Sequence, residues 1–104
     1  MGHYTWANGN TYEGKFVDGR KNGHGIWKKS GDNSNQYQGE YLDDRKHGWG
    51  VFSWASGGRY EGNYKNDSKS GYGEMTWADG SKYKGMWEDG VQNGPGLLLI
   101  KNGI

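Results

Sequence analysis

Cysteine is absent from this chain of 104 residues, and proline occurs once. The lack of cysteine excludes disulfides and thiolate metal sites, and it permits a reducing intracellular setting. Hydrophobic residues make up 31% of the chain, below the share of a typical globular domain. A core enclosed between two packed layers is therefore hard to build from this sequence.

An excess of one charge is lacking too, since 13 basic side chains stand against 12 acidic ones. Nucleic-acid binding usually needs a clustered basic face, so we expect no nucleic-acid partner. The longest apolar run, residues 97–100, is far too short to span a bilayer. The first residues have neither a basic region nor an apolar stretch, so a secretory signal peptide is not expected.

Glycine and aromatic residues are abundant, with 21 glycines and 15% aromatics, which favours turns and strands. A Tyr-x-Gly-x-aromatic unit occurs four times, and its leading tyrosines are 25, 23 and 23 residues apart. These units occupy residues 12–16, 37–41, 60–64 and 83–87. A Gly-x-Gly, a short strand-like run and a turn follow each unit. Internal repeats of this period indicate an array of small structural units.

The repeats form one array along the chain, with an incomplete repeat at each end. A partial repeat at 2–11 precedes full repeats at 12–36, 37–59 and 60–82, and the last repeat, 83–104, is incomplete. Asn8-Gly9, Asp79-Gly80 and Asn102-Gly103 are dipeptides that accept positive φ, so tight hairpin turns are predicted there. The two extra residues of the first full repeat fall in 30–36, which we predict to be a lengthened loop.

Side chains in a strand point alternately to opposite faces, and this alternation predicts an all-β, single-layer antiparallel meander. One face collects 14 of the 16 aromatic residues, and Trp49 and Tyr72 lie outside it. The 14 are Tyr4, Trp6, Tyr12, Phe16, Trp27, Tyr37, Tyr41, Phe52, Trp54, Tyr60, Tyr64, Trp77, Tyr83 and Trp87. The glycine inside each Tyr unit lets rings lie over the strand, and the Gly-x-Gly permits a bend or an unusual φ.

These residues resemble the MORN repeat (membrane occupation and recognition nexus). The family pattern is Tyr-Glu-Gly-x-Trp/Tyr, then Asn/Asp-Gly, then a basic residue before Gly-x-Gly, at a 23-residue period. The resemblance covers nearly the whole chain and implies β-hairpins in an elongated, curved sheet. It also implies a cytoskeletal or ciliary scaffold, a membrane-junction protein, or a module attached to an enzyme.

Two departures from that pattern stand out. Asp43-Asp44 and Asn66-Asp67 lack the glycine present at Gly19 and Gly90, which predicts altered loops in the middle repeats. An apolar run replaces the alternating last strand and suggests a contact at that end, because an unpaired strand edge is a hazard. The run could be a buried last strand, or it could be covered by a partner, by a second copy of the chain or by further residues. It consists of Leu97, Leu98, Leu99 and Ile100.

The aromatic face has two interpretations, which are compatible. Most rings are expected to pack on one another, because cross-strand aromatic pairs stabilise sheets. An uncovered side would also make the face a binding surface for a helix or an extended peptide. The face residues proposed for this role are Tyr12, Phe16, Tyr37, Tyr41, Phe52, Trp54, Tyr60, Tyr64, Trp77, Tyr83 and Trp87, and the best contacts are expected at the four leading tyrosines, Trp54 and Trp77.

Other functional readings are weaker. Recurring cations at Arg20-Lys21, Arg45-Lys46 and Lys69 could contact anionic lipid, but ordinary solvated loops are the favoured interpretation. His24 and His47 have no recurrent acid or nucleophile beside them, so we expect no catalytic residue, metal or cofactor. The sequence thus predicts a non-catalytic intracellular scaffold of a cytoskeletal or axonemal assembly, with end-to-end self-association as an additional contact. A phospholipid-binding module or a regulatory module of a separate enzyme are the alternatives.

Overall fold

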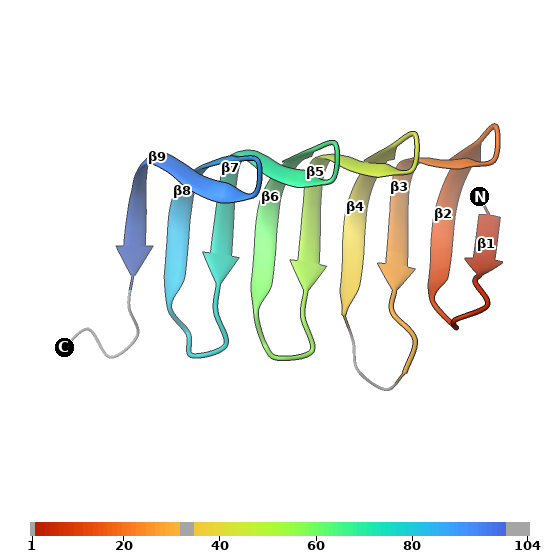
Figure 1. The fold of residues 1–104 in the computed structure, drawn as a ribbon, viewed down its shortest axis with the longest axis horizontal. Helices are drawn as coiled ribbons and strands as arrows, with labels where there is room; N and C mark the ends of the chain where they lie inside the picture. The colour runs from red at the N-terminus through yellow and green to blue at the C-terminus, as the bar shows by residue number, and fades with distance from the viewer. Residues whose placement is uncertain (1, 32–34, 100–104) are drawn as a thin grey trace.

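A computed structural model describes residues 2–31 and 35–99 of the chain. These residues form one antiparallel sheet in which nine strands pair with their neighbours in chain order (Figure 1). The predicted all-β meander is therefore confirmed. The molecule measures 49 × 29 × 17 Å. The strands are β1 (Gly2–Thr5), β2 (Thr11–Val17), β3 (Arg20–Lys28), β4 (Gln36–Leu42), β5 (Arg45–Ser53), β6 (Arg59–Lys65), β7 (Ser68–Thr76), β8 (Lys82–Glu88) and β9 (Val91–Leu99).

The two-residue turns lie at the opposite ends of the strands from where the sequence placed them. They follow the Tyr units, and both residues of each have left-handed φ angles between 49° and 85°. Two-residue hairpins need this backbone because its twist matches that of the strands. The turns are Asp18-Gly19, Asp43-Asp44, Asn66-Asp67 and Asp89-Gly90. The predicted alteration of the middle loops is wrong, because aspartate and asparagine adopt the same left-handed conformation there.

The turns at Asn8-Gly9 and Asp79-Gly80, predicted to be tight, are wider. Gly9 N–H donates to Trp6 O at 2.8 Å and Trp6 N–H donates to Asn10 O at 2.9 Å, and Gly9 has φ 93°. This is a three-residue hairpin loop that ends in a glycine bulge. The predicted turn at Asn102-Gly103 lies outside the described residues. The lengthened loop between β3 and β4 is present, although residues 32–34 within it are not described.

The sheet is bent along its whole length, and Figure 1 shows the upper hairpin ends turning away from the lower strands. The bend coincides with a register shift in every Tyr unit: Gly14 pairs with Gly25, but Phe16 pairs with Lys21. The odd-numbered strand thus has two more residues than its partner at the bend. The first glycine of its Gly-x-Gly, such as Gly23 at φ 90°, has a left-handed backbone. The predicted use of the Gly-x-Gly is confirmed.

The leading tyrosines lie in the corner that this bend creates, and we call Tyr12, Tyr37, Tyr60 and Tyr83 the corner tyrosines. Each hydroxyl donates to the carbonyl three residues on, as in Tyr37 to Glu40 O at 2.8 Å. The ring covers glycines of both paired strands: a Cβ at Gly50 would lie 2.2 Å from the Tyr37 hydroxyl oxygen. Paired glycines therefore make room for the ring, and the corner tyrosines are at most 5% exposed.

Candidate binding face

The inner face, on the inside of the bend, carries a continuous ladder of rings. Each corner tyrosine contacts the aromatic residue of its own Tyr unit and, in the first three repeats, that of the next repeat. Ring centroids lie 5.0–5.5 Å apart, and the planes meet at 75–89°, an edge-to-face geometry. The order along the ladder is Phe16, Tyr12, Tyr41, Tyr37, Tyr64, Tyr60, Trp87 and Tyr83. The ladder joins all full repeats into one core.

Lysine side chains from the beginnings of β3, β5 and β7, next to the two-residue turns, cover this ladder. Lys21 Nζ lies 5.1 Å from the Trp6 ring centroid and 5.5 Å from that of Tyr41. Lys46 lies in the same manner over Tyr37 of its own repeat and Tyr64 of the next, and Lys69 lies over Tyr60. Because these lysines lie in β3, β5 and β7 with their stems against rings, they differ from the solvated loop cations that the sequence suggested.

Aspartates of the following turns hold two of these lysines. Asp44 Oδ1 accepts a hydrogen bond from Lys21 N–H at 2.7 Å and lies 3.5 Å from Lys21 Nζ. Asp67 Oδ1 serves Lys46 in the same way, at 2.8 Å and 3.4 Å. The carboxylate therefore replaces glycine in the middle turns with a contact that links one hairpin to the next.

The environment of the ladder raises the pKa of several tyrosine hydroxyls. Burial is the main cause for Tyr12, Tyr37, Tyr41, Tyr60 and Tyr64, and it raises the pKa of Tyr60 to about 12. For Tyr37, the carboxylate of Glu40 adds to the rise. These hydroxyls are accordingly neutral groups that pack and donate hydrogen bonds.

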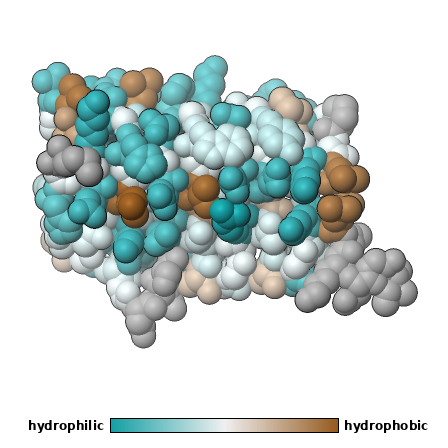
Figure 2. Space-filling view, turned by 180° about the vertical axis from the view of Figure 1, so that it is seen from behind, coloured by the Kyte–Doolittle hydropathy of each residue, from teal (hydrophilic) through white to brown (hydrophobic). Residues whose placement is uncertain are grey.

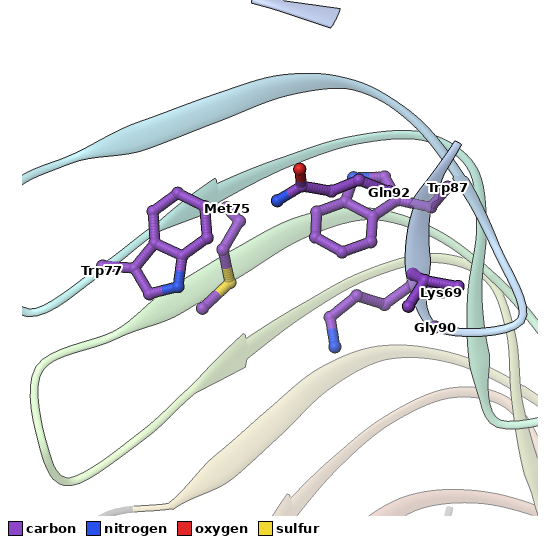
Figure 3. A pocket seen from close by; sticks show the side chains of 7 residues that line it. Lys69, Met75, Trp77, Trp87, Gly90 and Gln92 are labelled. Atoms are coloured by element: carbon purple, nitrogen blue, oxygen red, sulfur yellow. The ribbon is translucent and has the colours of Figure 1, made fainter. Parts of the chain in front are cut away.

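The lower half of the inner face is less covered. Its side chains pack against the ladder but are only partly buried, and they are Trp6, Trp27, Phe52, Trp54, Met75 and Trp77. A cavity of about 470 Å³ opens beside Trp77, Met75 and Lys69, towards the β9 end of the face (Figure 3). Another of about 410 Å³ lies beside Trp6 and Lys21 at the β1 end. The inner face is thus an apolar surface with a lysine row along one side.

The outer face has a different character. Figure 2 shows it as mostly hydrophilic, with scattered apolar atoms and a brown patch at the β9 edge. Trp49 and Tyr72, the two aromatics that the alternation excluded from the inner face, are 46% and 42% exposed. His24 Nδ1 lies 3.2 Å from Glu40 Oε2, an exposed pair. The two faces are therefore chemically distinct.

The sequence model of the MORN repeat matches residues 1–11, 12–32, 37–59, 60–82 and 83–104. The chain belongs to the MORN repeat family. No curated protein matches it. MORN repeats are commonly protein- or membrane-interaction modules and are generally not catalytic. Within the described ranges, no helix has the length and apolar character needed to cross a membrane, and no group of three or more acidic or histidine side chains could hold a metal ion.

The MORN array brings the predicted face residues together, but it divides them by accessibility. The corner tyrosines are buried against their own chain, as are Tyr41, Tyr64 and Trp87, which are at most 7% exposed. These rings support the face from beneath. Direct contact with a partner can fall on the partly buried rings, above all Trp54 and Trp77.

Sequence reasoning missed two components of the MORN inner face. Met75 occupies the position of Phe52 and Trp27 in neighbouring repeats, and counting aromatics alone passed over it. The pairing of Lys46 with Asp67 was missed because the residues are 21 apart. A signal was present, since a lysine recurs at the repeat period two residues before the first three Gly-x-Gly units, and Asp44 and Asp67 lie in the turns that follow the first two of these lysines.

The predicted end contact lies on β9, whose outer edge is unpaired in the described structure. Leu97, Leu98 and Leu99 are 55%, 55% and 44% exposed, so the interpretation of a buried last strand is wrong for them. Ile100 lies outside the described residues. Coverage of this edge by another molecule stays a prediction.

Proposed function

We propose that this MORN array is a non-catalytic scaffold whose inner face holds a segment of a partner protein, a helix or an extended peptide. The partly buried rings of the lower inner face carry this proposal, above all Trp54 and Trp77. They stand on an already packed layer of corner tyrosines, so their remaining surface is available without unfolding. Aromatic side chains on a rigid support are typical centres of protein interfaces.

The electrostatics of the inner face favour protein over lipid as the partner. Lys21 and Lys46 are paired with Asp44 and Asp67, and their side chains are 16% and 24% exposed. Cations that are already neutralised contribute little attraction to an anionic bilayer. We therefore expect no salt-sensitive sedimentation with vesicles that contain phosphatidylserine, and salt-sensitive pelleting would favour the lipid-binding alternative.

A pair of double variants tests the binding face. Trp54→Ala with Trp77→Ala removes inner-face rings, whereas Trp49→Ala with Tyr72→Ala removes exposed outer-face rings as a matched control. Truncating an aromatic contact at the centre of an interface costs about 2 kcal/mol or more, roughly a thirtyfold loss of affinity. Each protein is immobilised on a support and incubated with cell extract. We expect the inner-face variant to lose the partners that the wild type captures and the control to retain them.

Circular dichroism and thermal melting of both variants show whether the fold is intact. Equal capture by the folded inner-face variant and the wild type would contradict the proposal, as would equal loss from both variants. The nature of the captured proteins tests the finer proposal of a cytoskeletal or axonemal assembly. Capture of a single catalytic subunit would instead favour a regulatory module.

A further inference from the structure

The lysine–aspartate pairing of the inner face is broken in the last repeat. Lys21 and Lys46 each have an aspartate in the next turn, but Lys69 is followed there by Gly90. The backbone contact is kept, since Gly90 N–H donates to Lys69 O at 3.1 Å, as Asp67 N–H does to Lys46 O at 3.0 Å. Glycine has no side chain, so this turn supplies no carboxylate to Lys69 N–H or to Lys69 Nζ.

Lys69 is consequently a cation enclosed by rings without a charge partner. Its Nζ lies 5.6 Å from the Trp54 ring centroid and 5.4 Å from that of Tyr60. In the part of the chain that the structure describes, no carboxylate lies within ion-pair distance of Lys69. Burial, and secondarily the charge of Lys46, lowers the pKa of Lys69 below its usual value. A charge in such surroundings favours a ligand that neutralises it.

The space beside Lys69 is the cavity of about 470 Å³, and Figure 3 shows its lining. Lys69 and Gly90 lie together on one side, and Met75 and Trp77 lie across from them. Trp87 and Val91 add apolar surface to the lining. The cavity therefore has a cationic end and an apolar end.

We propose that this cavity is the docking site for an acidic residue of the partner protein, whose carboxylate takes the place that Asp44 and Asp67 fill in the other repeats. One carboxylate oxygen accepts from Lys69 N–H and faces Lys69 Nζ, and an apolar side chain next to the acidic residue packs on Met75 and Trp77. The inference rests on the proposed function, and it names the chemistry of the partner's contact residues.

The repeats themselves favour a carboxylate as the ligand. A single aspartate oxygen serves both nitrogens of Lys21 and of Lys46, so the same geometry at Lys69 is suited to one anionic oxygen. A neutral amide could accept from the N–H but would leave the ammonium charge uncompensated, and charge-assisted hydrogen bonds are roughly twice as strong as neutral ones. Phosphate shares the anionic chemistry and is tested separately.

NMR titration of the ¹⁵N-labelled protein tests the site with three probes: N-acetyl-Glu-Leu-amide, N-acetyl-Gln-Leu-amide and inorganic phosphate. We expect saturable shifts of the Lys69 and Gly90 amide resonances with the glutamate peptide. Loss of the charge should weaken binding of the glutamine peptide about tenfold. Shifts centred on Lys21 or Lys46, an absence of saturable shifts, or tighter binding of phosphate than of the glutamate peptide would overturn the proposal.

Gly90→Asp restores the missing carboxylate and should abolish binding of the glutamate peptide. The substitution fits, because a Cβ at Gly90 meets nothing within 4 Å and its φ of 85° is close to the 72° of Asp67. Gly19→Asp is the matched control, since its Cβ is equally free and its φ is 77°, but the described residues of β1, the strand paired with β2 on that side, include no lysine. We expect Gly19→Asp to bind like the wild type, and survival of binding in Gly90→Asp would refute the site.

The two proposals can fail separately. If the glutamate peptide does not bind but the Trp54 and Trp77 variant still loses its partners, the inner face remains the binding face and the acidic contact is wrong. If partners are retained by that variant while Gly90→Asp alone abolishes peptide binding, the Lys69 site stands and the wider face is wrong.

Discussion

A tyrosine ring seated on two paired glycines is the unit from which this fold is built. Tyr37 lies over Gly39 and Gly50, and the ring carbons come within 2.4–2.5 Å of where a Cβ at Gly50 would be. Its hydroxyl donates to Glu40 O at 2.8 Å. Glycine at this position thus serves close packing, because Gly50, unlike Gly48, does not have a left-handed φ.

Gly50→Ala is predicted to destabilise the protein by about 2 kcal/mol, because the new methyl group must displace a fully buried ring. Tyr37→Phe keeps the ring and removes one hydrogen bond, so it should cost about 1 kcal/mol. Urea unfolding of both variants gives the two free energies. A Gly50→Ala protein as stable as the wild type would show that the ring can move without loss, contrary to this packing argument.

At the scale of the element, each hairpin has one two-residue turn and one wider turn, and the sequence does not separate them by composition. Gly9, in a wide turn, and Gly19, in a tight turn, both follow a residue that tolerates turns, and both have positive φ. The two loop lengths differ in their hydrogen bonds and in the residue before the glycine, because Asp18 has a left-handed φ and Asn8 does not. The tight turn at Asp43-Asp44 has no glycine to indicate it in the sequence, because both aspartates adopt the left-handed backbone.

Strand pairing and the division into faces were predictable, because both depend on a period of two and a repeat of 23 residues. The bend was only partly predictable from the sequence. Gly-x-Gly indicated a change of direction, but the two-residue register shift opposite Lys15 depends on pairing between strands. The bend buries Tyr12 and its equivalents. Because the sequence pattern did not reveal the bend in full, it predicted exposed rings at these positions.

The β9 strand belongs to the same scale, and its pairing has a geometric constraint. Nine antiparallel strands in chain order give β1 and β9 the same direction. If the inner faces of two copies lie on the same side, antiparallel pairing of β9 therefore requires another β9 across a two-fold axis, whereas β9 with β1 would be parallel. Pro95 has no N–H to donate to a partner strand, whereas Leu97, Leu98 and Leu99 are exposed beyond it.

Leu97→Lys with Leu98→Lys is predicted to abolish self-association through this edge, because like charges would meet across the two-fold axis. Sedimentation equilibrium should show dimers of the wild type at high concentration and monomers of the variant. Leu42→Lys is the control, since Leu42 is 46% exposed in an interior strand and should leave dimers intact. A wild type that stays monomeric would contradict self-association through this edge.

At the scale of the whole molecule, the ring ladder makes the repeats interdependent. Isolated two-stranded hairpins are marginal, and repeat arrays gain their stability from neighbouring units. Here the edge-to-face contacts from Tyr12 to Tyr41, from Tyr37 to Tyr64 and from Tyr60 to Trp87 cross from one repeat to the next. Whatever disturbs the rings as a class should therefore unfold the array as one body.

Alkaline pH is such a disturbance, and the direction follows from the raised pKa values. Five tyrosines in the ladder have a folded-state pKa above the ordinary 10.0, with Tyr60 at about 12. Their contribution to stability is complete below pH 10 and is lost as the pH rises through the folded values, because the unfolded chain releases these protons first. Lys69, with a lowered pKa, acts in the opposite direction but is a single group.

We therefore predict that the free energy of unfolding, measured by urea titration, is constant near neutral pH and falls steeply above pH 10. Each buried tyrosine contributes a slope of about 1.4 kcal/mol per pH unit within its window. Tyr41→Phe should remove one such contribution with little other change, because Phe16 stands at the same position in the first repeat. Phe16→Tyr should make the fall steeper. Equal slopes in the wild type and both variants would mean that these hydroxyls ionise as readily in the folded protein as in the unfolded chain, and that the ladder is open to water.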